Sequence, residues 1–151
     1  MWACLKRNSD QITALASIAG VVGILLTFWQ VWTASDQLRS SNEYGIRKDL
    51  REVVATAFEG GMNSDCLRNL SNCSNEDQTK TKRGVGLVFN FHQSVFGQAK
   101  AGGISKQFEK EMARDFCSWF QSELVRNYWD AQVKAGSYDE NRVAMRKEWC
   151  Q

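Results

Sequence analysis

The chain has 151 residues, a net charge of +2 and a charged fraction of 24%. This length suffices for one anchor and one compact domain, and so small a positive charge does not indicate a nucleic-acid-binding protein, which usually carries a strongly basic face. The chain contains no proline. Because proline interrupts helices and punctuates loops, its absence favours long, unbroken helices.

Residues 12–32 form an apolar segment near the N-terminus that no charge interrupts. About 20 residues at a helical rise of about 1.5 Å cross the hydrocarbon core of a bilayer, and Trp29 and Trp32 would lie at its interface. A buried core helix and a cleaved signal peptide are alternatives, the latter with Lys6 and Arg7 as its basic start. However, the segment is longer than a usual signal core and ends in bulky tryptophan. The sequence therefore predicts that residues 1–34 hold a tail and one uncleaved membrane anchor.

The predicted anchor has two different faces. Small side chains recur every three or four residues on one face: Thr13, Ala16, Ser17, Gly20, Gly23 and Thr27. Such faces let membrane helices approach closely, although glycine and alanine are also common in membrane helices that pack against nothing. We expect this face to pack against another helix, either a second copy of the chain or a larger partner.

The charges beside the anchor barely orient it. Lys6 and Arg7 precede it, whereas Arg39 and then Arg47, Lys48 and Arg51 follow it. Basic residues near a span favour the cytoplasmic side, and here the two flanks nearly cancel. The larger total after the span slightly favours a cytoplasmic domain.

The residues that follow the anchor predict helices throughout. An apolar stripe at helical spacing predicts a helical stalk over residues 35–61, with a break near residues 40–45 and a stop at Gly60-Gly61. Residues 62–151 form the predicted extramembrane domain. Its first part, residues 63–81, is rich in Asn, Ser and Asp and predicts one short helix near residues 66–70 followed by a loop.

Three longer helices are predicted in the rest of the domain. The first covers residues 82–99, and the second begins after Ser105 and continues, directly or through an extension, to Gly136. A capping box at residues 137–140, Ser-Tyr-Asp-Glu, opens the last. The expected fold class is therefore all-α: a single N-terminal transmembrane helix with a long stalk and a small helical bundle.

The segment from Leu87 to Trp129, together with the anchor, resembles a loosely defined bacterial family of uncharacterised small membrane proteins. The matching residues are Asn90-Phe91, Gly103-Ile104-Ser105 and Arg126-Asn127-Tyr128-Trp129. The family usually has an acidic residue where this chain has His92. The resemblance implies one N-terminal span and a helical domain, and it implies no activity.

The residues that could carry chemistry are few. Cys66, Cys73, Cys117 and Cys150 could form two disulfides in an oxidising compartment, with Cys66–Cys73 closing the polar loop, or remain free thiols in the cytoplasm. A zinc site is not expected, because there is no CxxC pair and only one histidine. That histidine, His92, has no visible nucleophile or acid as partner and is expected to be a core residue. We predict no catalytic residue, no metal and no cofactor.

The predicted function is accordingly a non-enzymatic accessory or scaffold subunit. Its anchor would pack against a larger membrane complex or a second copy, with lipid as the other partner and no nucleic acid. Arg126, Tyr128 and Trp129 could stack as a cation–π cluster, although a helix end fixed by aromatic packing is the favoured interpretation. They are also the residues expected on a possible partner surface, because these residue types dominate interface hot spots. The alternative is a membrane-tethered sensor or signalling module that uses the helical domain or its thiols as a switch.

Overall fold

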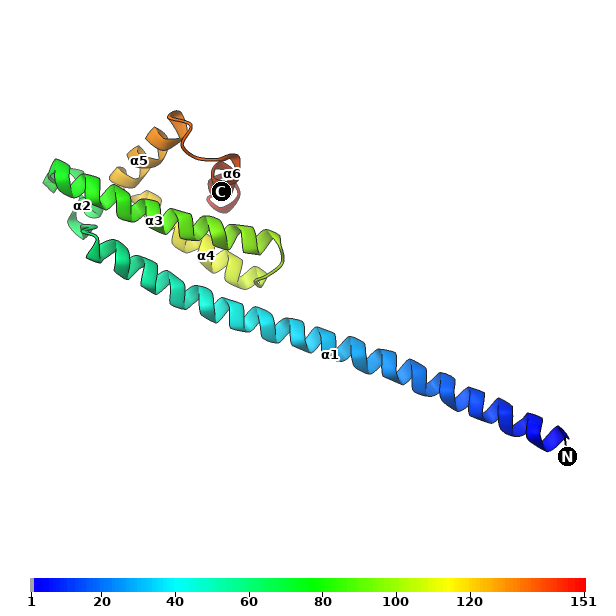
Figure 1. Ribbon diagram of the computed structural model, residues 1–151. Helices are drawn as coiled ribbons and strands as arrows, with labels where there is room; N and C mark the ends of the chain where they lie inside the picture. The colour runs from blue at the N-terminus through cyan, green and yellow to red at the C-terminus, as the bar shows by residue number, and fades with distance from the viewer. Residues whose placement is uncertain (1) are drawn as a thin grey trace. The chain divides into compact units, whose positions relative to one another are not determined.

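A computed structural model describes the backbone of residues 2–151 and the side chains of residues 16–151 except residue 72. The described residues form six α-helices and two short 3₁₀ helices with no strand (Figure 1), which confirms the all-α prediction. The chain divides into two compact units, Met1–Leu38 and Arg39–Gln151.

The first unit consists of the N-terminal part of α1 (Trp2–Glu59). Among the described residues, α1 alone is long and apolar enough to cross a membrane, by its length and composition. Every described side chain from residue 16 to residue 38 is exposed, so this segment is not a core helix of the described fold. The predicted break at residues 40–45 is absent, because α1 continues to Glu59. Gly45 costs the helix only about 1 kcal/mol relative to alanine, and burial of the next residue, Ile46, offsets this cost.

The second unit begins with the C-terminal part of α1, the segment predicted as a helical stalk. Ile46 and Ala57 retain only 4% and 1% of their exposure and so belong to the domain core. Three side chains also hold the turn that follows α3. Arg39 Nε donates to the Gly102 carbonyl at 3.1 Å, Asn42 Nδ2 donates to the Gly103 carbonyl at 2.9 Å, and Glu43 accepts from the Ser105 amide at 2.7 Å. Residues 39–59 are thus an integral part of the domain.

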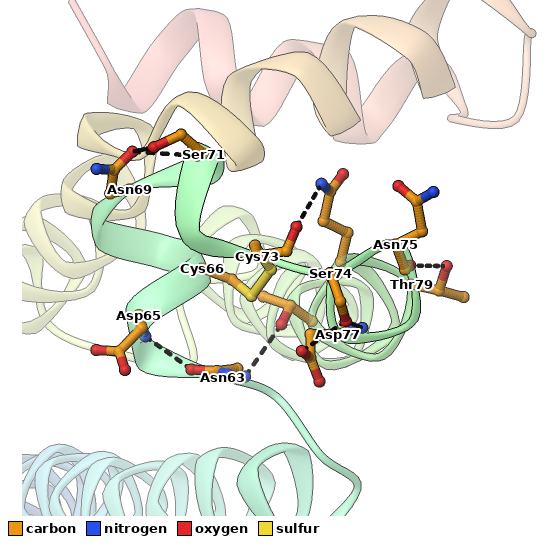
Figure 2. The surroundings of a disulfide bond; sticks show 12 residues. Asn63, Asp65, Cys66, Asn69, Ser71, Cys73, Ser74, Asn75, Asp77 and Thr79 are labelled. Carbon is orange, nitrogen blue, oxygen red and sulfur yellow. Dashed lines mark hydrogen bonds between the residues drawn. A yellow bond between two sulfur atoms is a disulfide. The ribbon is translucent and has the colours of Figure 1, made fainter.

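The polar segment after α1 contains more helix than predicted. It forms α2 (Ser64–Arg68), η1 (Leu70–Asn72) and the start of α3 (Asn75–Lys100). The predicted start at residue 82 is wrong, because Ser74 caps α3 by accepting from the Asp77 amide at 3.1 Å (Figure 2). Glu76 and Asp77 lie in the first turn, where the helix dipole favours negative charge.

The helix predicted after Ser105 is divided in two. α4 (Lys106–Ser118) and η2 (Trp119–Gln121) precede α5 (Glu123–Lys134), and Ser122 between them is extended, with ψ of 130°. Arg126 compensates for the break by donating to the carbonyls of Phe120 and Gln121, at 2.8 and 2.9 Å. The last helix, α6 (Glu140–Trp149), is capped by Asp139 and not by Ser137.

An aromatic cluster forms the centre of the domain. The Phe89 ring on α3 lies 5.3 Å from the ring of Phe116, 5.5 Å from that of Phe120 and 5.3 Å from that of Trp129. Edge-to-face and offset pairs at these distances add to the stabilisation from burial. A second cluster joins Ile46 of α1 to α3 and α4, through Val95, Ala99, Ile104, Phe108 and Met112. This second cluster attaches α1 to the rest of the domain.

Candidate interaction surfaces

The small-residue face of the apolar helix is exposed in the structure. Apart from the adjoining backbone of the helix itself, no described atom lies within 4 Å of the position that a Cβ would occupy at Gly20 or Gly23. These two glycines and Thr27 line a shallow hollow of about 510 Å³, bordered by Ile24, Phe28 and Val31. The Thr27 hydroxyl donates to the Gly23 carbonyl at 2.9 Å, so it is satisfied within the helix. Ala16 and Ser17 are also exposed, and the Thr13 side chain lies outside the described residues.

Of the residues predicted for a possible partner surface, which lie in the first half of α5, Arg126 is exposed whereas Tyr128 and Trp129 are not. Trp129 is only 2% exposed and packs in the aromatic core, so it cannot present its indole to a partner. Tyr128 is half-buried. The guanidinium of Arg126 contacts the carbonyls that end η2, as described above. The sequence motif therefore contributes to a helix joint and to the aromatic core.

Other cations lie over the aromatic rings. Arg146 on α6 is 4.4 Å from the centroid of Phe120 and 5.3 Å from that of Trp129, and Arg142 is 4.5 Å from that of Tyr138. These contacts attach α6 to the core. Half-buried Tyr138 has a raised pKa, chiefly because burial disfavours the phenolate, so this ring stays neutral beside Arg142.

His92 is a core residue, as expected. Its side chain is fully buried, with Nδ1 2.8 Å from the Val88 carbonyl and Nε2 3.1 Å from a carboxylate oxygen of Asp115. Both ring nitrogens are thus occupied by acceptors of the protein, and the ring has no access to a substrate. The described residues contain no cluster of His, Cys, Asp and Glu suited to a metal ion.

Two disulfides cross-link the domain. Cys66 on α2 pairs with Cys73, which follows η1 (Figure 2), as the spacing of these cysteines allowed. Cys117 on α4 pairs with Cys150 after α6. The first disulfide closes the polar segment on itself, whereas the second joins the last helix to the middle of the domain. None of these four cysteines offers a free thiol in this state.

A groove that the sequence did not indicate lies between α1 and α3, with a volume of about 580 Å³. The two helices run in opposite directions there (Figure 1). Its lining residues are Ile46, Asp49, Glu52, Val53 and Thr56 of α1 and Leu87, Asn90, Phe91, Ser94, Val95 and Gln98 of α3. Their spacing of three or four places each set along one side of its helix. No sequence signal could have found this groove, because it depends on which two helices lie side by side.

The walls of the groove differ in charge. The α1 wall carries Asp49 and Glu52, both exposed, and neither forms an ion pair within the part of the chain that the structure describes. Glu111 on α4 contrasts with them, because Arg47 binds it and holds the pKa of its carboxyl below the usual value. The groove therefore has one wall with two carboxylates that form no ion pair among the described residues.

Comparisons with protein families, with curated proteins and with solved structures find no match to this chain. The bacterial family suggested by residues 87–129 therefore remains a prediction.

Proposed function

We propose that the chain is a non-enzymatic, single-pass membrane subunit that packs its apolar helix against a larger membrane protein complex. The observation that carries this proposal is the complete exposure of the described apolar segment from residue 16 onward. An exposed apolar helix of this length needs lipid or another helix to cover it. The open surface at Gly20 and Gly23 suits the close approach of a partner helix.

The non-enzymatic part of the proposal is supported by the environment of the one histidine. His92 is fully buried between two acceptors, and a general base must reach the proton that it removes. The four domain cysteines are paired in disulfides, and this pairing favours a structural role for them over a thiol sensor.

We further propose that the domain lies on the oxidising side of the membrane. Disulfides persist in secreted and periplasmic proteins and are rare in the reducing cytosol. The two disulfides of the domain are stronger evidence for its location than the small excess of basic residues that favoured the cytoplasm. Those charges nearly cancel across the span.

Purification in mild detergent tests the helix-packing role. The tagged chain is expected to co-purify with a larger membrane protein, and the paired substitution Gly20→Ile with Gly23→Ile is expected to remove that partner, because β-branched side chains prevent close approach. Val22→Ile on the opposite face is the matched control and should retain it. A chain that purifies alone as a monomer would contradict the proposal.

A further inference from the structure

We propose that the groove between α1 and α3 binds a helical segment of a different protein, one that carries lysine or arginine beside apolar side chains. This inference names the contact that the domain would make within the complex proposed above and rests on that proposal. Asp49 and Glu52, which line one wall of the groove, are the residues that would select the partner.

The floor and walls of the groove match an amphipathic helix. Ile46, Val53 and Val95 line its floor, and Leu87 beside them is 45% exposed although it is apolar. The rest of the α3 wall is uncharged and consists of apolar Phe91 and polar Asn90, Ser94 and Gln98. From residue 46 to residue 56 the groove follows α1 for about 15 Å, or about three helical turns. Recognition of a helix in a groove uses apolar anchors spaced along one face over such a length.

The two carboxylates of the α1 wall predict the sign of the charge on the partner. Asp49 and Glu52 lie three residues apart and so face the same side of α1. Neither carboxylate has a cationic partner among the described residues. A bound segment with lysine or arginine along one edge would supply those cations, and complementary charge at an interface increases both specificity and the rate of association.

The same charges argue against a second copy of the chain as the occupant. Two copies anchored through their N-terminal helices would have parallel α1 helices, related by a two-fold axis along the membrane normal. If the groove lay at that axis, Asp49 and Glu52 would face their own counterparts, and like charges in close contact disfavour association. This repulsion disfavours a symmetric pair of copies, which is why the proposed occupant is a different protein.

Site-specific photo-crosslinking of the full chain in its native membrane tests the inference. A photoreactive phenylalanine analogue at Leu87 is expected to form one adduct with another protein, and mass spectrometry should place the adduct in a segment that contains lysine or arginine. The same analogue at Tyr44, which is 68% exposed on α1 and does not line the groove, is the control and should give no such adduct.

Charge reversal supplies the second measurement. Glu52→Lys is expected to lower the adduct yield at Leu87 about fivefold, because it replaces an attraction with a repulsion. Glu59→Lys makes the same change one heptad further along the same face of α1, outside the groove. It should leave the yield within about twofold of the parent, since exposed charges at that distance are screened by salt.

The remaining outcomes overturn the inference. An adduct of twice the chain mass would show that the occupant is a second copy, and an adduct with lipid alone would show that no protein binds there. A crosslinked segment with acidic residues in place of lysine or arginine would contradict the predicted charge of the partner. The inference also fails if Leu87 gives no more adduct than the Tyr44 control, or if Glu52→Lys and Glu59→Lys give equal adduct yields. If a partner co-purifies but Leu87 forms no adduct, binding in the groove is contradicted while the proposed helix-packing role is retained. Absence of any co-purifying partner defeats the proposed function itself.

Discussion

Gly84 and Gly97 both lie within α3 but have opposite surroundings. A Cβ at Gly84 would lie 2.9 Å from the Met62 Cβ and 3.2 Å from the Ala57 Cβ, whereas a Cβ at Gly97 meets nothing within 4 Å. We predict that Gly84→Ala lowers the free energy of unfolding by about 1–3 kcal/mol through overpacking. Gly97→Ala should raise it by about 0.5–1 kcal/mol, because alanine favours the helix. Urea denaturation followed by circular dichroism compares the two, and a stabilising Gly84→Ala would contradict the close contact of α1 with α3.

Asp139 makes the stability of α6 depend on pH. Its carboxylate accepts from the Arg142 amide at 2.8 Å and from the Gln93 amide at 2.8 Å, and the first of these contacts is the main reason that its pKa is lowered. A lowered pKa in the folded state stabilises the fold above the unfolded value of about 3.9, and this contribution is lost as the pH falls through the lower, folded value.

The substitution Asp139→Asn isolates this effect, because asparagine can still cap the helix but does not titrate. We predict that the wild-type chain has the higher Tm at pH 7 and that this difference shrinks below about pH 3.9. Thermal unfolding of both chains at pH 7 and at pH 3 measures it. A difference that stays constant between the two pH values would show that the carboxylate is not responsible.

At the scale of elements, the two disulfides should contribute unequally to stability. Cys66 and Cys73 are separated by 7 residues and Cys117 and Cys150 by 33. Because a longer loop loses more entropy when it is closed in the unfolded chain, removal of the first should cost about 2.5 kcal/mol and removal of the second about 4 kcal/mol.

Paired alanine substitutions, Cys66→Ala with Cys73→Ala and Cys117→Ala with Cys150→Ala, test this order by urea denaturation without reductant. Adding reductant to the wild-type chain should reproduce the sum of the two losses. Equal losses for the two pairs would mean that local contacts, and not loop length, determine the contribution of each disulfide.

The sequence predicts which helices exist better than where they end. Periodic apolar residues indicated α1, α3 and α6, because a core-facing stripe is a property of each helix alone. The start of α3 was missed because its first turns are polar and Ser74 stabilises them through a cap. The break before α5 was missed because Arg126, four residues beyond Ser122, satisfies the carbonyls there.

Some of the candidate surfaces could be recognised from the sequence, and others could not. The small-residue face follows from helical spacing within one segment, so it could be recognised from the sequence. The burial of Trp129 and the groove beside Asp49 result from contacts between helices that are distant along the chain. No local pattern encodes such contacts, which explains why the sequence alone left both aromatic packing and a partner surface open for the motif ending in Trp129.

At the scale of the whole molecule, the chain joins an apolar segment with no described cover to a domain that has its own core. Residues 33–38 are all that separates Trp32 from the start of the domain at Arg39. Six residues span at most about 20 Å even when fully extended. In the proposed complex, a partner bound to the apolar helix would be tethered to the domain through this short segment, and the groove would then bind a second segment of it at a raised effective concentration.

The disulfides yield a prediction for the topology of the whole chain. If the domain lies on the oxidising side, a membrane-impermeant maleimide added to intact cells should label none of Cys66, Cys73, Cys117 and Cys150, because they are paired. After treatment with an impermeant reductant, the same reagent should label all four, while Cys4, which precedes the span, stays unlabelled on the other side. A cytoplasmic domain would give the opposite result, since its thiols would be reduced: in intact cells the four domain cysteines would stay unlabelled under either condition while Cys4 would be exposed to the reagent, and all four would be labelled in a lysate without reductant. The charges beside the span nearly cancel, so the oxidation state of these cysteines is the stronger indicator of the side on which the domain lies.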